Sequence, residues 1–188
     1  TDFPGGAYSQ VFFVADVQAT GEMAEGGVQI SVSKKDFCIV MPIKTKDSVR
    51  LIGIVPAENE NKENIRYKDV SYSVKVNTGL DVQKINWFSN YHVHHRVAVD
   101  FQKDRVFISG DAGHIHSPAG GQGMNTGIGD AINLAWKLAD VIQGNFDPQI
   151  LKSYHEERHA FAKILIQTTD QAFKLIASRG IIGSFFRA

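Results

Sequence analysis

The residues best suited to binding a cofactor lie in one stretch of the sequence, Gly110–Asn125. Asp111 follows an apolar run, Arg105–Ser109, which we predict to be a buried strand with the carboxylate at its C-terminal edge. Ligand sites of α/β folds lie at that edge, and an ionised carboxylate accepts hydrogen bonds from the hydroxyl groups of a sugar-like chain. This position therefore predicts a binding role for Asp111.

The loop after Asp111 carries little side-chain bulk and leads into a predicted helix. It is rich in glycine and contains Pro118, so the backbone can approach a flat ligand closely. The helical pattern begins near Met124, and the free N–H groups and dipole of a helix N-terminus favour negative charge. Carboxylate, bare backbone and helix end together predict a cradle for a large anionic cofactor.

The glycine spacing by itself identifies no nucleotide-binding motif. Gly121, Gly123 and Gly127 have G-x-G-x-x-x-G spacing and follow the predicted strand only after about a dozen residues. A dinucleotide-binding turn has G-x-G-x-x-G and follows its strand at once. The P-loop pattern G-x-x-x-x-G-K-[ST] does not occur, which excludes that class of nucleotide site.

Taken whole, the segment resembles the flavin-binding motif of the para-hydroxybenzoate hydroxylase family, the single-component aromatic hydroxylases that use FAD. The resemblance covers Arg105–His114 (RVFISGDAGH), Pro118–Asn125 (PAGGQGMN) and Asp130–Leu138 (DAINLAWKL). Tyr154–Arg158 (YHEER) is similar to the following helix of the family. The first hundred residues fit the family's middle, substrate-bearing sheet by position and pattern.

The resemblance implies a role for each matched position. Asp111 would accept a hydrogen bond from the ribityl chain, and Pro118, the catalytic position, would lie beside the flavin edge at which oxygen reacts. Backbone N–H groups at the start of the helix would face the pyrimidine side of the ring, where the reduced flavin is negative. The cofactor-binding set implied is Gly110, Asp111, Pro118, Gly121, Gly123, Met124 and Asn125.

The reaction implied is reduction of FAD by NADH or NADPH, followed by O2-dependent hydroxylation of an aromatic, polycyclic or polyketide-like substrate. Two departures from the family pattern are present. Gly113 replaces an expected alanine, and the family's N-terminal βαβ unit and Asp-Gly segment have no counterpart in these 188 residues. We therefore expect this chain to carry about half of a flavin site and to be inactive alone.

Other interpretations remain open at this point. Asp111, His114 and His116 lie within six residues and could chelate zinc or iron, but a metal site would leave the glycine platform without a purpose, so we predict no metal. A flavoprotein of the same fold with non-hydroxylating redox chemistry, or an inactive scaffold, are the alternative functions. Candidate substrate neighbours are Met41, Pro42 and His94.

The elements around this segment predict an α/β fold. Residues 1–100 read as an antiparallel-rich, substrate-binding sheet domain, with a hairpin formed by Val28–Ser33 and Phe37–Pro42. Residues 101–188 read as the C-terminal part of an FAD-binding domain: a strand, the glycine-rich loop, and a helix over about Met124–Gln143 that Gly144 ends. A long helix is predicted from Asp147 to Arg179, with Gly180 as its C-cap.

The composition excludes several function classes. Lys plus Arg equals Asp plus Glu at 20 each, so no net charge indicates nucleic acid or an anionic membrane as a partner. The single cysteine, Cys38, excludes an internal disulfide, and we predict it to be a small buried hydrophobic residue. Trp136 and Phe146 are predicted as core residues. We see no membrane-spanning run and expect a cytoplasmic protein.

Overall fold

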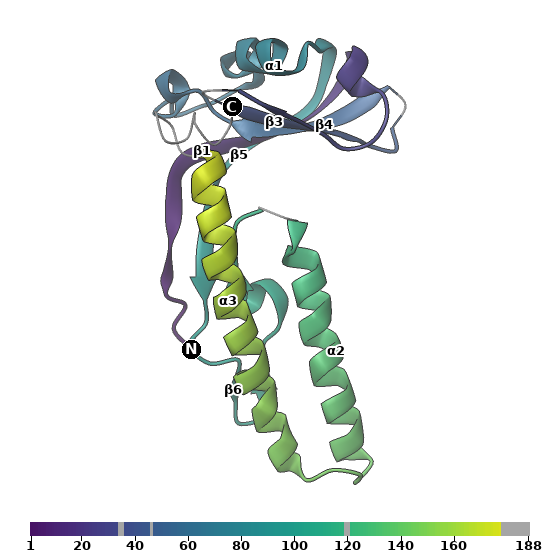
Figure 1. Ribbon diagram of the computed structural model, residues 1–188, viewed down its shortest axis with the longest axis vertical. Coiled ribbons are helices and arrows are strands. Elements are labelled where there is room, and N and C mark those ends of the chain that lie inside the picture. The colour runs from purple at the N-terminus through teal and green to yellow at the C-terminus, as the bar shows by residue number, and fades with distance from the viewer. Residues whose placement is uncertain (34–35, 46, 119–120, 178–188) are drawn as a thin grey trace. The chain divides into compact units, whose positions relative to one another are not determined.

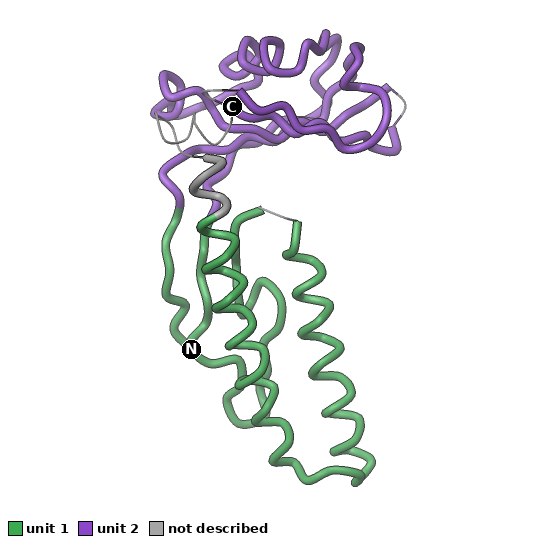
Figure 2. Tube along the Cα trace, in the orientation of Figure 1, with its two compact units in different colours: residues 1–7, 94–174 green, residues 8–93, 175–188 purple. Residues whose placement is uncertain are grey.

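The computed structural model describes residues 1–33, 36–45, 47–118 and 121–177, with side chains up to Gln171. The chain packs into two compact units, coloured separately in Figure 2. The first, here called the helical unit, combines Thr1–Ala7 with His94–Lys174, and the second, here called the sheet unit, contains Tyr8–Val93. The predicted domain boundary at residue 100 is a division by function and stays a prediction. By packing, the chain divides within a strand, β5 (Asp81–Val97).

The sheet unit consists of antiparallel strands with a short helix (Figure 1). Its strands follow the order β2-β3-β4-β1-β5. Within the helical unit, β8 (His114–Ile115) pairs antiparallel with Arg96 and Val97 at the end of β5. Cys38 of β3 pairs with Gly53 of β4, and Phe12 of β1 pairs with Ile54. The remaining elements are β1 (Gly5–Thr20), β2 (Gln29–Val32), β3 (Phe37–Pro42), β4 (Ser48–Ile54) and α1 (Ser71–Thr78).

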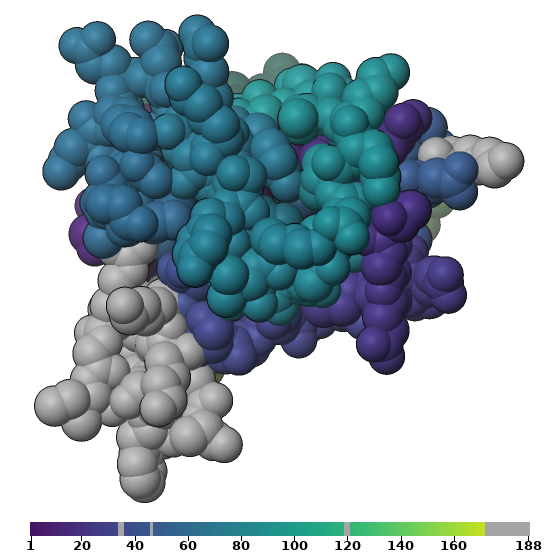
Figure 3. Space-filling view, turned by 90° about the horizontal axis from the view of Figure 1, so that it is seen from above, coloured from purple at the N-terminus to yellow at the C-terminus, as the bar shows by residue number. Residues whose placement is uncertain are grey.

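The core of the sheet unit follows from alternation along β1. Every second side chain points to the same face of a strand, and the odd-numbered residues from Val11 to Ala19 that face the core are at most 6% exposed. The segment between β4 and β5, blue to teal in Figure 3, covers this core, and Ile65, Val70 and Val74 are its buried contacts. Cys38 is 2% exposed in the same cluster, which confirms its predicted burial.

The helical unit places two long helices side by side and antiparallel (Figure 1). Phe101 and Tyr154, both fully buried, centre its core, and the Tyr154 hydroxyl donates to the Ile108 carbonyl at 2.7 Å. The aromatic ring of Phe107 packs edge-on against Tyr154. Its elements are β6 (Gln102–Lys103), β7 (Val106–Phe107), the 3-10 turn η4 (Gly110–Ala112), β8, α2 (Gly123–Ile142), the 3-10 turn η6 (Pro148–Leu151) and α3 (Lys152–Ala177).

Local signals in the sequence predicted several of these elements correctly. The antiparallel pairing of β2 with β3 confirms the hairpin, and α2 confirms the helix predicted over about 124–143. Gly144, with a φ of +76°, occupies the left-handed conformation that ends a helix. Asp147 accepts a hydrogen bond from the Gln149 N–H at 2.8 Å, as a helix N-cap does. The mixed architecture confirms the predicted α/β class.

Two predictions differ from the structure. The strand expected at 105–109 is reduced to β7, which pairs with β6. A strand exists only where a neighbour accepts its hydrogen bonds, which the apolar pattern does not reveal. Trp136 and Phe146 are 43% and 49% exposed, so the prediction of core residues is wrong; the two rings pack edge-on against each other. The predicted C-cap Gly180 lies outside the described residues.

Candidate functional site

The glycine-rich segment leaves the core of the helical unit through one tight turn. In η4 the Gly113 N–H donates to the Gly110 carbonyl at 2.8 Å, and Gly110 has a φ of +59°, which favours glycine. The Gly113 carbonyl then accepts the Ala98 N–H at 2.7 Å, and β8 pairs with the end of β5. The C-terminal side of the turn that carries Asp111 is therefore anchored to the end of β5 and to Ala98, which follows it.

Asp111 presents its carboxylate to solvent. The residue is exposed, and no residue in the described part of the chain bonds its side chain. An ionised carboxylate has acceptor capacity only, so hydroxyl or N–H donors of a ligand are its natural partners. The structure thus leaves Asp111 available for the binding role predicted from the sequence.

The other predicted cofactor residues lie around the N-terminus of α2. Pro118, Met124 and Asn125 are exposed, and Gly121, with a φ of +63°, has open space where a side chain would lie. The first N–H groups of a helix have no acceptor inside the helix, and within the described residues no side-chain cap bonds those of α2. Backbone donors of Gly123, Met124 and Asn125 are accordingly available for an anionic group.

A buried carboxylate that sequence analysis did not assign a role connects this segment to both helices. Asp130 of α2 has no exposed surface. Its Oδ2 accepts the Gly110 N–H at 3.0 Å and His114 Nε2 at 2.7 Å, and its Oδ1 accepts Arg158 Nε at 2.7 Å. Burial raises the pKa of Asp130, but the hydrogen bonds from His114, Arg158 and Gly110 outweigh it and hold the pKa below its usual value. Asp130 is therefore an anion at neutral pH.

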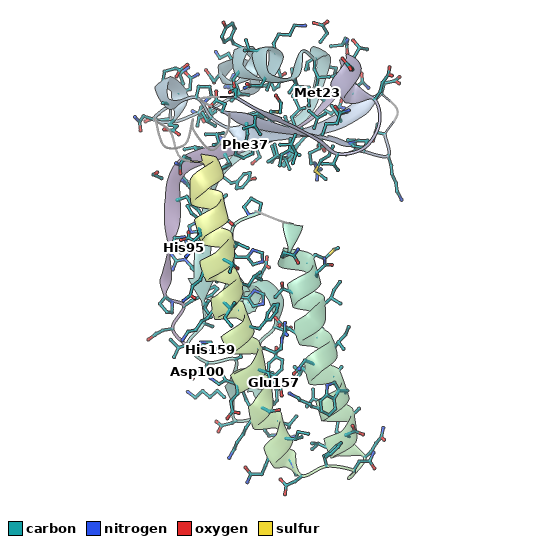
Figure 4. All side chains as sticks on the ribbon, viewed as in Figure 1. Met23, Phe37, His95, Asp100, Glu157 and His159 are labelled. Atoms are coloured by element: carbon teal, nitrogen blue, oxygen red, sulfur yellow. The ribbon has the colours of Figure 1, made fainter. Side chains whose placement is uncertain are left out.

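A second polar link joins α2 to α3 farther along the helices. The Lys137 ammonium, 1% exposed, lies 2.9 Å from Glu157 Oε2, and the Asn133 amide donates to the same oxygen at 2.7 Å. Figure 4 shows Glu157 on the part of α3 beside α2. The hydrogen bonds from Asn133 and Lys137 lower the pKa of Glu157. Both links pair a charge on one helix with a charge on the other, and only the Asp130 link reaches the turn at Gly110.

The two histidines of the segment have separate protein partners. Because ionised Asp130 can only accept, His114 Nε2 carries the proton of that bond; His114 is 1% exposed. His116 Nδ1 donates to the Ser117 carbonyl at 2.8 Å, and its buried Nε2 has no partner among the described residues. A side chain at Gly123 would come within 3.7 Å of that Nε2, so the ring lies against the start of α2.

The structure does not bring Asp111, His114 and His116 together as a chelating set. Asp111 faces solvent while His114 bonds Asp130, and the described residues contain no group of three or more His, Cys, Asp or Glu side chains suited to a metal ion. That this protein binds no metal ion remains a prediction.

The three candidate substrate neighbours lie on strands of different units. Met41 and Pro42 end β3, where they pair with Arg50 and Val49 of the sheet unit. His94 is a half-buried residue of β5 within the helical unit. Their contact with a substrate stays a prediction.

The arrangement fits an FAD ribityl chain and isoalloxazine ring at the edge of the helical unit. Asp111 supplies an exposed acceptor, α2 supplies N–H groups that no side chain of the described residues caps, and His116 supplies a buried nitrogen without a partner among the described residues. Gly110 and Gly121 adopt left-handed backbone conformations and carry no side chain that could obstruct a ligand at those two positions. Hydroxyl groups and an anionic ring edge complement this donor and acceptor set.

Comparisons with known proteins agree with this fit. A family model described as "FAD binding domain" matches residues 3–169. The uncharacterized aromatic compound monooxygenase YhjG of Bacillus subtilis (strain 168) is 31% identical over 179 residues, which is 93% of this chain and 36% of that protein. Two solved structures are similar. The Diels-Alderase PyrE3 of pyrroindomycin biosynthesis has a TM-score of 0.77 and 30% identity over 94% of this chain and 39% of its own. CabE, an aromatic hydroxylase from angucycline biosynthesis, has a TM-score of 0.70 and 28% identity over 100% of this chain and 40% of its own.

The chain spans between 36% and 40% of the length of these proteins. Within the described residues, no helix combines the length and the apolar character needed to cross a membrane.

Proposed function

This chain belongs to the FAD-binding domain family, and we propose that it forms part of an FAD-dependent monooxygenase. The proposed reaction hydroxylates an aromatic or polyketide-like substrate, with NADH or NADPH as reductant. One atom of O2 enters the ring, the other leaves as water, and the nicotinamide supplies two electrons. The single observation that carries the proposal is the exposed Asp111 carboxylate on the glycine-rich segment that leads to the N-terminus of α2, which no side chain in the described part of the chain caps.

In this proposal the bound FAD supplies the redox chemistry and the reaction with oxygen. The residues of the chain bind and orient it. Asp111 accepts a hydrogen bond from a ribityl hydroxyl. The N–H groups of Gly123, Met124 and Asn125, together with the helix dipole, stabilise negative charge on the reduced ring. Pro118, which offers no N–H group and has a fixed φ, forms a rigid wall at the reacting edge.

The proposal includes a division of the flavin site between this chain and further polypeptide. A stripe of apolar side chains runs along α2 at four-residue spacing, and its members are 43% to 75% exposed. Isolated exposed apolar residues are ordinary, but a continuous stripe marks a surface that another element covers. The 188 residues contain no G-x-G-x-x-G turn of the kind that holds a pyrophosphate. The stripe consists of Met124, Ile128, Ile132 and Trp136.

Two measurements test the proposal. Purified chain 1–188 should bind FAD weakly and show no turnover, because the contacts to adenosine and pyrophosphate are missing; tight stoichiometric binding in equilibrium dialysis would contradict this. The complete enzyme should incorporate label from ¹⁸O2 into an aromatic product with NAD(P)H present. Product without label, or oxidation without oxygen transfer, would refute the monooxygenase reaction.

A second candidate function has support from one observation. The similarity to a Diels-Alderase at 30% identity indicates that this fold also occurs in a protein named for a ring-forming reaction. A same-fold flavoprotein with non-hydroxylating chemistry would give an unlabelled product in the ¹⁸O2 experiment. An inactive scaffold would give no product. A cytoplasmic location, where reduced nicotinamide is available, is part of the first proposal.

A further inference from the structure

Asp130 connects three segments of the helical unit through one carboxylate. The donors are the backbone of Gly110, the imidazole of His114 and the guanidinium of Arg158, at 3.0, 2.7 and 2.7 Å. Asp130 is fully buried, and the Arg158 side chain is 15% exposed. Three donors to one buried anion define its position and, reciprocally, the position of each donor.

Two glycines allow this contact to form. A side chain at Gly127, one turn before Asp130 on α2, would come within 3.4 Å of the Gly110 Cα, so helix and turn approach at backbone distance. A side chain at Gly129 would come within 3.3 Å of Arg158 Nη2. A Cβ at Gly127 would touch the Gly110 backbone, and a Cβ at Gly129 would require the end of the Arg158 side chain to shift by a few tenths of an ångström. Gly127 and Gly129 therefore serve the close approach to this carboxylate.

We infer that Asp130 is a positioning residue for the flavin site: it fixes the turn Gly110–Gly113 and thereby aims the Asp111 carboxylate at the ribityl chain. The inference rests on the proposed function for its flavin part. Gly110 immediately precedes Asp111, and its left-handed φ of +59° sets the direction in which the chain continues. The bond from the Gly110 N–H to Asp130 holds that conformation from the buried side.

The chemistry of the carboxylate explains why an acid occupies this position. Oδ2 accepts two bonds while Oδ1 accepts the third from Arg158. An amide offers one oxygen and two donors, so asparagine cannot accept from all three groups at once. Since Arg158 compensates the charge, Asp130 holds the turn without adding a free negative charge beneath the anionic cofactor.

The first test needs no cofactor and uses chain 1–188 in solution. NMR should detect scalar coupling across the bond between the Gly110 N–H and the Asp130 carboxylate in the unmodified chain. Asp130→Asn should speed hydrogen exchange of the Gly110 amide about fivefold to tenfold, because bonds to charged acceptors are roughly twice as strong as neutral ones. The resonances of Asp111 should shift as well.

Glu157→Gln is the matched control. It makes the same carboxylate-to-amide change at the other link between α2 and α3, which has no bond to the turn. We expect Glu157→Gln to lower stability while leaving Gly110 exchange, referenced to global unfolding, within about twofold. Absence of the coupling, or equal changes in the two variants, overturns the inference even if Asp130→Asn folds poorly, because the coupling is measured on the unmodified chain.

The second test measures FAD affinity in the complete enzyme under conditions in which each variant is folded. Asp130→Asn should weaken FAD about tenfold, and Glu157→Gln should leave the affinity within about twofold. Equal affinity in Asp130→Asn and the unmodified enzyme overturns the positioning role alone. An unmodified enzyme that binds no FAD refutes the proposed function and the flavin part of the inference, while the NMR result still decides whether Asp130 fixes the turn.

Discussion

Replacing Asp111 by alanine in the complete enzyme tests the proposed flavin site at an exposed carboxylate. In the structure the carboxylate faces solvent and bonds no described residue, so the apo-protein should change in stability by no more than about 0.5 kcal/mol. A hydrogen bond from a ribityl hydroxyl to a charged acceptor contributes roughly 1.5–3 kcal/mol. Asp111→Ala should therefore weaken FAD binding about tenfold to a hundredfold. Asp111→Asn keeps an acceptor without the charge and should fall between.

The assay pairs FAD dissociation constants with melting curves of the apo-protein. Glu156→Ala is the control, because Glu156 is an exposed carboxylate on α3 of the same unit, away from the glycine-rich segment. The control should leave both quantities unchanged. If Asp111→Ala kept normal FAD affinity, the assignment would be refuted. If it lowered the melting temperature with and without FAD while affinity stayed normal, Asp111 would support only the loop.

Three further predictions concern burial and charge. Burial, with a smaller contribution from Asp36, raises the pKa of Cys38 to about 12, so a thiol reagent at pH 8 should label the chain only after denaturant is added; fast native labelling would contradict this. Gly53→Ala should cost about 1–3 kcal/mol in urea unfolding, since its Cβ would lie 2.8 Å from the Phe13 ring, whereas Gly27→Ala, with nothing within 4 Å, should cost little. The lowered pKa of Asp130 contributes stability that is present above its unfolded pKa of about 3.9 and lost as pH falls through its folded value. Unfolding measured between neutral pH and pH 3 should therefore show a smaller loss in Asp130→Asn than in the unmodified chain; parallel curves would contradict this.

Interactions between residues close in sequence allowed several elements of this chain to be predicted from the sequence. Glycine ends a helix because it adopts positive φ without strain, so Gly144 marks a helix end in the sequence as in the structure. The Asp147 cap and the β2–β3 hairpin depend on neighbours within a few residues. The order of carboxylate, glycine loop and helix end is likewise local, and so the segment that we propose binds the flavin could be identified from sequence alone.

Contacts between distant residues were decided only by the tertiary structure. Asp130 lies among apolar neighbours on α2, and nothing in that pattern indicates that its partners are a backbone N–H 20 residues earlier and a guanidinium 28 residues later. Trp136 has a large apolar side chain of the kind found in protein cores, yet it is half-exposed. The face of α2 that packs toward α3 is a different one, which carries Asn133. A buried charge is stable only with hydrogen-bond donors beside it, and the tertiary fold decides which residues those donors are. Sequence periodicity indicates only which face of a single element is apolar.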